Sequence, residues 1–170
     1  MEENKNIIFV GLMGSGKTTI GKQISKLLER DFLDTDHSIE IKTGVNISTI
    51  FELEGEEGFR LREHNLLIDL IGSKKKVIAT GGGIILSDKN RELLSQLGTV
   101  IYLKSNIQDL VLRLKEDKTR PLLQKVNLAA KLNDLYNERD PLYTSIANYI
   151  IETKNKKIND LKKEILELLK

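Results

Sequence analysis

The segment at residues 11–18 constrains this chain more than any other feature. Its sequence, GLMGSGKT, fits the pattern G-x-x-x-x-G-K-[ST], and the apolar run at residues 7–10 comes directly before it. Apolar residues at helical spacing follow, so the segment joins a predicted strand to a predicted helix. Glycines at such positions let backbone N–H groups turn inward around phosphate oxygens, and the helix N-terminus adds partial positive charge. The segment therefore predicts a phosphate-binding loop for a nucleoside triphosphate.

Two side chains at the end of this loop have predicted roles of their own. We expect Lys17 to reach the β- and γ-phosphates and the Thr18 hydroxyl to ligate Mg²⁺, which is the expected cofactor. The predicted nucleotide-binding residues of the loop are Gly14, Ser15, Gly16, Lys17, Thr18 and Thr19.

The chain lacks two features of common nucleotide hydrolases. No Asn-Lys-x-Asp sequence is present to read guanine, and the apolar run at residues 77–80 ends in three glycines where an aspartate is usual. Asp34 and Asp36 are the nearest candidates to help hold the metal. Residues two apart in an extended segment point to the same side, so both carboxylates are predicted to face the phosphates, one near metal and one near an acceptor hydroxyl. The alternative is a helix N-cap followed by an acidic first turn.

Short apolar runs alternate with longer segments of helical period along the rest of the chain, which is typical of an α/β domain with a mostly parallel sheet. The predicted strands are 7–10, 31–34, 77–80, 99–103 and 149–151. The first predicted helix carries Ile20, Ile24, Leu27 and Leu28 on one face, and the last has an apolar stripe of Ile158, Leu161, Ile165 and Leu168. Between them, the predicted helices are 37–44, 46–71, 88–97, 106–115 and 127–147, and the second of these is interrupted at Gly55 and Gly58. We expect one domain over residues 1–170.

Composition excludes several other classes of protein. With 27 Lys and Arg against 25 Asp and Glu, the net charge is +2, which gives no argument for a nucleic-acid or membrane-surface partner. The chain has no cysteine, which excludes disulfides, cysteine-based zinc sites and thiol nucleophiles. No apolar run approaches the length of about 20 residues that spans a bilayer, and no signal-peptide pattern opens the chain, so a cytoplasmic location is expected. The two histidines, His37 and His64, lie in polar contexts and are predicted to be surface residues.

Further motifs follow the phosphate-binding loop in a fixed order. They are D-T-D at 34–36, F-x-x-x-G-E-x-x-F-R at 51–60, the triple glycine at 81–83, R-P-L-L at 120–123 and Y-x-x-R at 136–139. With these motifs in this order, the chain resembles the shikimate kinases, of the nucleoside-monophosphate-kinase-like P-loop group. The resemblance runs from the loop to about residue 143. It implies a three-layer P-loop fold with a five-stranded parallel sheet in the order 2-3-1-4-5, flanked by helices.

The resemblance implies transfer of the γ-phosphoryl group of ATP to the 3-hydroxyl of shikimate, in chorismate and aromatic amino acid biosynthesis. Region 37–71 would bind shikimate and 115–126 would form a mobile lid. Arg60 and Arg139 would clamp the shikimate carboxylate, which suits paired hydrogen bonds from a guanidinium. Asp36 would contact the ring hydroxyls. The backbone of Gly81, Gly82 and Gly83 would approach the substrate closely, where side chains would block it.

On the nucleotide side, the resemblance implies that Asp34 assists the Mg²⁺ shell beside Thr18, through water. Arg120, in the predicted lid, would stabilise the transferring phosphoryl group, so the implied catalytic residues are Lys17, Asp36 and Arg120. Arg113 would stack on adenine or else be a solvated helix charge, and a second adenine contact would fall near residues 153–155. A monomer is expected. The alternatives are a related small-molecule kinase, such as a gluconate kinase, and a nucleotide-binding module that has lost catalysis.

Overall fold

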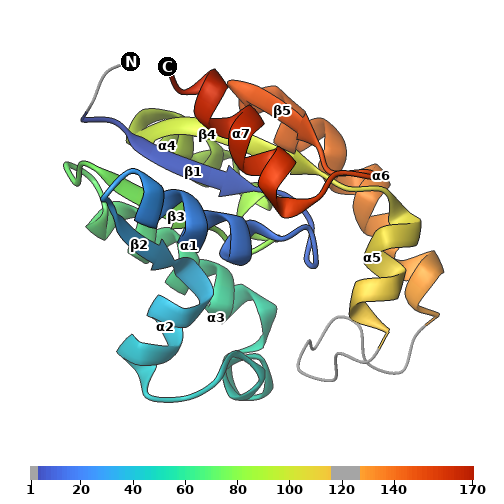
Figure 1. Ribbon diagram of the computed structural model, residues 1–170. Coiled ribbons are helices and arrows are strands. Elements are labelled where there is room, and N and C mark those ends of the chain that lie inside the picture. Colours follow the sequence, from blue (N-terminus) through green and yellow to red (C-terminus); the bar gives the residue numbers. More distant parts are fainter. Residues whose placement is uncertain (1–3, 116–126) are drawn as a thin grey trace.

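A computed structural model describes residues 4–115 and 127–170 of the chain (Figure 1). Within these residues, five strands form one parallel sheet in the order β2-β3-β1-β4-β5, as predicted. The strands are β1 (Asn6–Val10), β2 (Asp31–Asp34), β3 (Lys76–Ala79), β4 (Gly98–Lys104) and β5 (Tyr149–Glu152).

Each predicted helix is present, with small changes at the ends. The helices are α1 (Lys17–Leu27), α2 (Thr35–Thr43), α3 (Ile47–Asp69), α4 (Asp88–Leu97), α5 (Ile107–Leu114), α6 (Leu128–Ile146) and α7 (Ile158–Leu168). A short 3₁₀ helix, η1 (Ile84–Leu86), was not predicted. In the described part of the chain, no helix combines the length and the apolar character that a membrane span needs.

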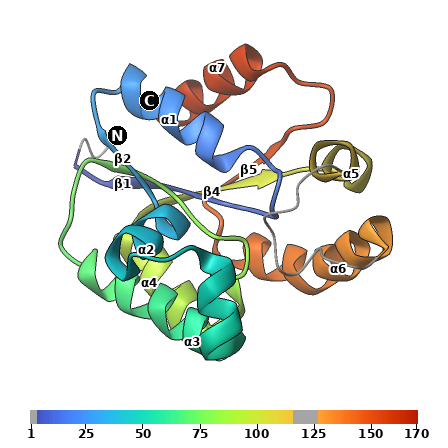
Figure 2. The same ribbon diagram turned by 90° about the horizontal axis from the view of Figure 1, so that it is seen from below.

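The sheet separates two apolar cores, and β1 shows how the sequence builds both. Successive strand residues point to opposite faces. Ile7 and Phe9 therefore pack on the face covered by α1 and α7, whereas Ile8 and Val10 pack on the face covered by α3, α4 and α6 (Figure 2). Every residue of β1 is buried. A strand covered on both faces needs apolar residues at almost every position, which explains why residues 7–10 form a continuous apolar run.

The topology brings distant motifs to one edge of the sheet. β1 lies between β3 and β4. After β1 the chain crosses to β2 on one side of the sheet, and after β4 it continues to β5 on the other side. In open parallel sheets, ligands bind outside the carboxyl ends of the strands at such a reversal of strand order. The phosphate-binding loop follows β1, the D-T-D segment begins at the end of β2, and the triple glycine follows β3.

Two details of the predicted helices are wrong. Leu27 is 55% exposed, because Leu28 takes the place on the buried face of α1 one turn after Ile24. Gly58 does not interrupt α3. The break occurs at Gly55 alone, whose φ of 71° and ψ of −176° are not helical. At Gly58 the helix continues, and the missing Cβ makes room for the side chain of Glu54.

Candidate active site

The phosphate-binding loop turns through left-handed backbone at Gly14 and Gly16, where φ is 78° and 93°. Side chains are strained in this region, so glycine is required at both turns. The Nζ of Lys17 donates hydrogen bonds to the carbonyl oxygens of Gly11 at 2.8 Å and Leu12 at 2.9 Å, and the side chain is buried. The ammonium group is thereby held against the loop, at the N-terminus of α1.

Asp34 connects this loop to α2. The Thr18 hydroxyl donates to Oδ2 of Asp34 at 2.6 Å. Oδ1 of Asp34 caps α2 by accepting from the backbone N–H groups of Asp36 at 3.1 Å and His37 at 3.3 Å. The N-cap is therefore Asp34, and α2 begins at Thr35 rather than at residue 37.

The predicted reason for pairing Asp34 with Asp36 is only half correct. Asp34 ends a strand, but Asp36 belongs to the first turn of α2, so the two do not alternate along one extended segment. Both nevertheless line the same cavity. The helical turn, and not strand pleating, brings them there.

This first cavity has a volume of about 420 Å³. All six predicted nucleotide-binding residues of the loop line it, together with Asp34, Asp36 and Arg113. Nη1 of Arg113 donates to the carbonyl oxygen of Gly14 at 3.0 Å, which places this exposed side chain beside the loop. Thr153 also lines the cavity. The first cavity thus combines phosphate-binding groups with segments more than 90 residues away.

A second cavity, of about 450 Å³, adjoins the first. The two share the residues Met13, Asp36, Gly81 and Gly82. We call residues 81–83 the glycine bridge. Arg60, Glu63 and Arg139 line the second cavity, as do side chains from α2, α3 and the turn between them. Two ligands, one bound in each cavity, would approach each other beside Asp36 and the glycine bridge.

Arg60, on α3, is the centre of an ion-pair cluster in the second cavity. Its Nη1 contacts Oε2 of Glu63 at 2.6 Å and its Nη2 contacts Oε1 of Glu56 at 2.7 Å. Burial alone lowers the pKa of Arg60, but the charges and hydrogen bonds of Glu63 and Glu56 leave that pKa raised. Arg60 is therefore charged, and its guanidinium is held in one orientation.

Glu63 is fully buried beside Arg60. Burial raises the pKa of Glu63 to about 7, although the charge of Arg60 lowers it, and the charge of Asp36 raises it further. Among the described residues, Oε1 of Glu63 has no hydrogen-bond partner. The second cavity therefore contains a carboxyl group that changes protonation near neutral pH.

Arg139 brings the second positive charge to this cavity from α6, and its side chain is only 3% exposed. The glycine bridge lies close to these charged groups. A Cβ on Gly83 would overlap the guanidinium of Arg60, and a Cβ on Gly81 would lie 2.5 Å from Oδ1 of Asp36. A side chain at Gly83 would have to displace Arg60, and one at Gly81 would have to displace Asp36 and Glu63.

Comparison with known proteins agrees with this geometry. The family model described as shikimate kinase matches residues 13–170. A shikimate kinase of Burkholderia thailandensis is 51% identical over 161 residues, which cover 95% of this chain and 88% of the relative. The solved shikimate kinase of Acinetobacter baumannii in complex with shikimate has a TM-score of 0.93 at 50% identity, covering 97% of this chain and 92% of that chain. The chain belongs to the shikimate kinase family.

Membership in the shikimate kinase family makes the chain an ATP-dependent phosphotransferase of the shikimate pathway. A gluconokinase of Sinorhizobium meliloti also superposes, with a TM-score of 0.63 over 96% of this chain and 90% of that chain. At 15% identity, that likeness shows the fold alone.

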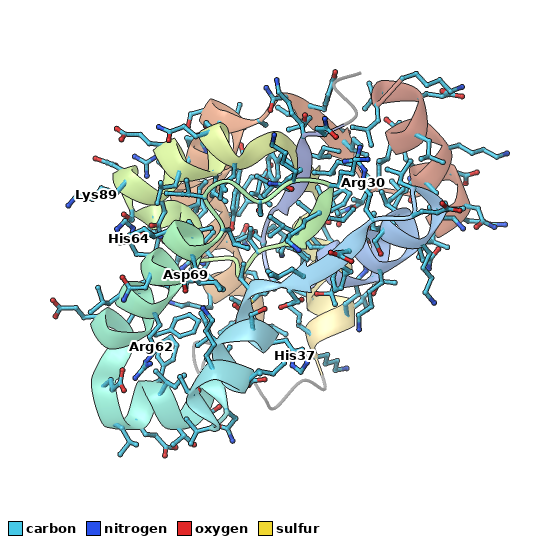
Figure 3. All side chains as sticks on the ribbon, turned by 90° about the vertical axis from the view of Figure 1, so that its left-hand side faces the viewer. Arg30, His37, Arg62, His64, Asp69 and Lys89 are labelled. Carbon is cyan, nitrogen blue, oxygen red and sulfur yellow. The ribbon has the colours of Figure 1, made fainter. Side chains whose placement is uncertain are left out.

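The described residues include two of the three predicted catalytic residues, Lys17 and Asp36. Arg120 and residues 116–126 of the predicted lid lie outside the described residues. Of the two histidines, His37 is exposed on α2 as predicted, but His64 is half-buried on α3, where its Nδ1 lies 2.7 Å from Oδ1 of Asn90 (Figure 3). Neither histidine lines the two cavities.

Several lining residues were not singled out from the sequence. In the first cavity they include Lys156, Ile158 and Leu161. In the second they include Glu40, Asn46, Ile47 and Ser48, which fall within the predicted region 37–71. They carry no motif of their own. Asn46 could have been found as a helix cap, since its side chain accepts from the N–H of Thr49 at 2.8 Å, but a cap signal does not indicate a cavity wall.

Proposed function

We propose that the chain transfers the γ-phosphoryl group of ATP to the 3-hydroxyl of shikimate, giving shikimate 3-phosphate and ADP. The observation that carries this proposal is the common wall of the two cavities. The phosphate-binding loop lies in the first cavity and the two arginines lie in the second, with Asp36 and the glycine bridge between them. This arrangement supports direct transfer between two ligands bound side by side.

In the first cavity, the loop N–H groups and Lys17 would bind the β- and γ-phosphates. Thr18 and Asp34 fit a place beside Mg²⁺, because both present oxygen atoms and lie 2.6 Å apart next to the loop. Two protein oxygen groups are too few to surround a cation by themselves. They suit Mg²⁺, because this ion keeps several water ligands and binds substrate phosphates. When bound, Mg²⁺ would neutralise phosphate charge. Arg113 would contribute to holding the nucleotide.

In the second cavity, Arg60 and Arg139 would bind the shikimate carboxylate. Each guanidinium can donate paired hydrogen bonds to a carboxylate. Glu56 and Glu63 orient Arg60 through contacts at 2.7 and 2.6 Å. Region 37–71 supplies most of the remaining wall, through α2 and α3.

Asp36 would contact the hydroxyl that attacks the γ-phosphate, because it lines both cavities. In a loose phosphoryl-transfer transition state the attacking hydroxyl needs little deprotonation early, so the main role of Asp36 is to orient that hydroxyl. We further propose that one chain acts alone, which light scattering after size-exclusion chromatography tests.

A coupled ADP-release assay distinguishes the candidate functions. We expect shikimate to stimulate ADP release strongly over the rate without acceptor, and gluconate to have no effect. Stimulation by gluconate instead would indicate the related kinase, and no stimulation by either would indicate a nucleotide-binding module without catalysis. Mass detection of shikimate 3-phosphate confirms the product.

A further inference from the structure

The glycine bridge is held from both sides by buried hydroxyl groups that the proposed mechanism does not use. On one side, the N–H of Gly81 donates to Oγ1 of Thr35 at 2.8 Å. Thr35 is fully buried and lies between Asp34 and Asp36. The position of Gly81 is thereby tied to the segment that carries both aspartates.

On the other side, the hydroxyl of Tyr143 donates to the carbonyl oxygen of Gly82 at 2.5 Å. Tyr143 is fully buried on α6, one helical turn after Arg139. Burial raises the pKa of Tyr143, although the charge of Arg139 and its hydrogen bond to the same hydroxyl lower it. The group therefore keeps its proton and donates at neutral pH.

Gly82 also lies against the phosphate-binding loop. A Cβ on Gly82 would be 3.4 Å from the backbone N of Met13 and 3.5 Å from the carbonyl oxygen of Gly11. The bridge thus touches the loop of the first cavity while its two hydrogen bonds lead to Asp36 on one side and Arg139 on the other. A shift of the bridge would change the distance between the two ligands.

We propose that Thr35 and Tyr143 are positioning residues, which hold the glycine bridge so that the acceptor hydroxyl and the γ-phosphate stay aligned. This inference rests on the proposed function. Each hydroxyl satisfies one backbone group of the bridge, and each comes from an element that carries a proposed substrate-binding residue. Reacting groups must be held within a fraction of an ångström, so a small displacement lowers the rate of transfer even when both ligands remain bound.

The first test replaces Tyr143 by Phe, which keeps the ring and removes only the hydroxyl. We expect kcat to fall about tenfold, because the Gly82 carbonyl loses its partner and the bridge shifts. Binding of ADP alone, measured by calorimetry, should not change. This split between kcat and nucleotide affinity is one that a general loss of packing would not produce.

Tyr102→Phe is a matched control. The Tyr102 ring packs on Tyr143 with centroids 4.9 Å apart, it is equally buried, and its hydroxyl also donates one hydrogen bond, to Asp140 at 2.8 Å. It does not bond to the bridge. We expect both variants to lower the unfolding temperature by a similar few degrees, and only Tyr143→Phe to lower kcat. Equal losses of kcat in both variants, or a wild-type kcat in Tyr143→Phe, would overturn the inference.

A second pair of variants tests the other side of the bridge and serves if Tyr143→Phe does not fold. Thr35→Val removes the acceptor for the Gly81 N–H at nearly constant volume, and Thr35→Ser restores it. We expect kcat to fall with Val and to recover with Ser, and equal kcat in the two would contradict the proposal. Wild-type activity with shikimate tests the proposed function separately. When wild type is active, the outcomes of the two pairs of variants decide the inference.

Discussion

The two adjoining cavities of the candidate site are built in different ways. The first uses mainly one continuous stretch, residues 13–20, whose backbone and Lys17 face the space where phosphates would bind. The second has no such stretch. Its charged groups come from α2, α3 and α6, which line it together with the glycine bridge. A triphosphate can be recognised by local backbone, whereas a small carboxylate needs side chains from several elements. The second cavity therefore depends more on packing and on buried charge.

Removing Lys17 would affect the first cavity most. In Lys17→Ala we expect kcat to fall about 10²–10³-fold, on the scale of losing one preorganised charge contact to the transition state. Steady-state kinetics measure the loss, and circular dichroism checks that the fold remains. Lys26→Ala, an exposed lysine in the last turn of the same helix, should keep wild-type kcat. A folded Lys17→Ala protein of near-normal activity would contradict the assignment of the first cavity.

The buried charge of the second cavity predicts a pH-dependent stability. Because the pKa of Glu63 is raised from 4.5 to about 7 in the fold, the folded state holds a proton that the unfolded state has lost. The contribution of Glu63 to stability is present below pH 4.5 and is lost as pH rises towards 7 and beyond. The change corresponds to about 3 kcal/mol in the free energy of unfolding.

Urea denaturation of wild type and Glu63→Gln from pH 4.5 to 8 measures this change. We expect the difference in unfolding free energy between the two proteins to vary with pH over that window. Glu56→Gln is the control, because Glu56 contacts the same arginine but is partly exposed. We expect the change with pH to be larger for Glu63→Gln than for this control. If the difference in unfolding free energy between Glu63→Gln and wild type does not vary with pH, burial does not perturb this carboxyl group.

Arg60→Lys tests whether the second cavity needs a guanidinium or only a positive charge. A lysine cannot present the planar pair of donors that a carboxylate prefers, nor keep both glutamate contacts of Arg60. We expect shikimate binding to weaken by about 1.5–3 kcal/mol, the scale of a hydrogen bond to a charged group. ATP affinity should not change, and Arg62→Lys, on the exposed side of α3 with Glu54, should alter neither. Equal loss of both affinities would place Arg60 on the nucleotide side.

Arg113→Ala should give the smallest effect, confined to the first cavity. Its hydrogen bond to Gly14 is exposed to solvent, so we expect KM for ATP to rise only about two- to tenfold. KM for shikimate should stay at the wild-type value. Gln108→Ala, a substitution at an exposed position on the same helix, is the control. A larger effect on shikimate than on ATP would show that the two cavities do not separate the substrates as proposed.

Sequence alone determined the framework of this protein. Buried parallel strands need continuous apolar runs, and glycines in left-handed turns cannot be replaced, so both leave signals within a few residues. The strands and helices were predicted almost at their observed bounds, and residues 14–19, which the sequence singled out, all line the first cavity. The sheet order followed from the ordered motifs and the family that they resemble.

Tertiary structure decided what each side chain contacts. The turn of α2, and not a strand, brings Asp36 to both cavities, and burial beside Arg60 raises the pKa of Glu63. Thr35 lies inside the D-T-D motif, but neither its local sequence nor that of Tyr143 predicts a contact with the glycine bridge, because each hydrogen bond joins residues 46 or 61 positions apart. Such contacts exist only after the sheet has brought the ends of β2 and β3 and helix α6 together. The energetic effect of a buried charge or hydroxyl depends on neighbours that local sequence does not specify.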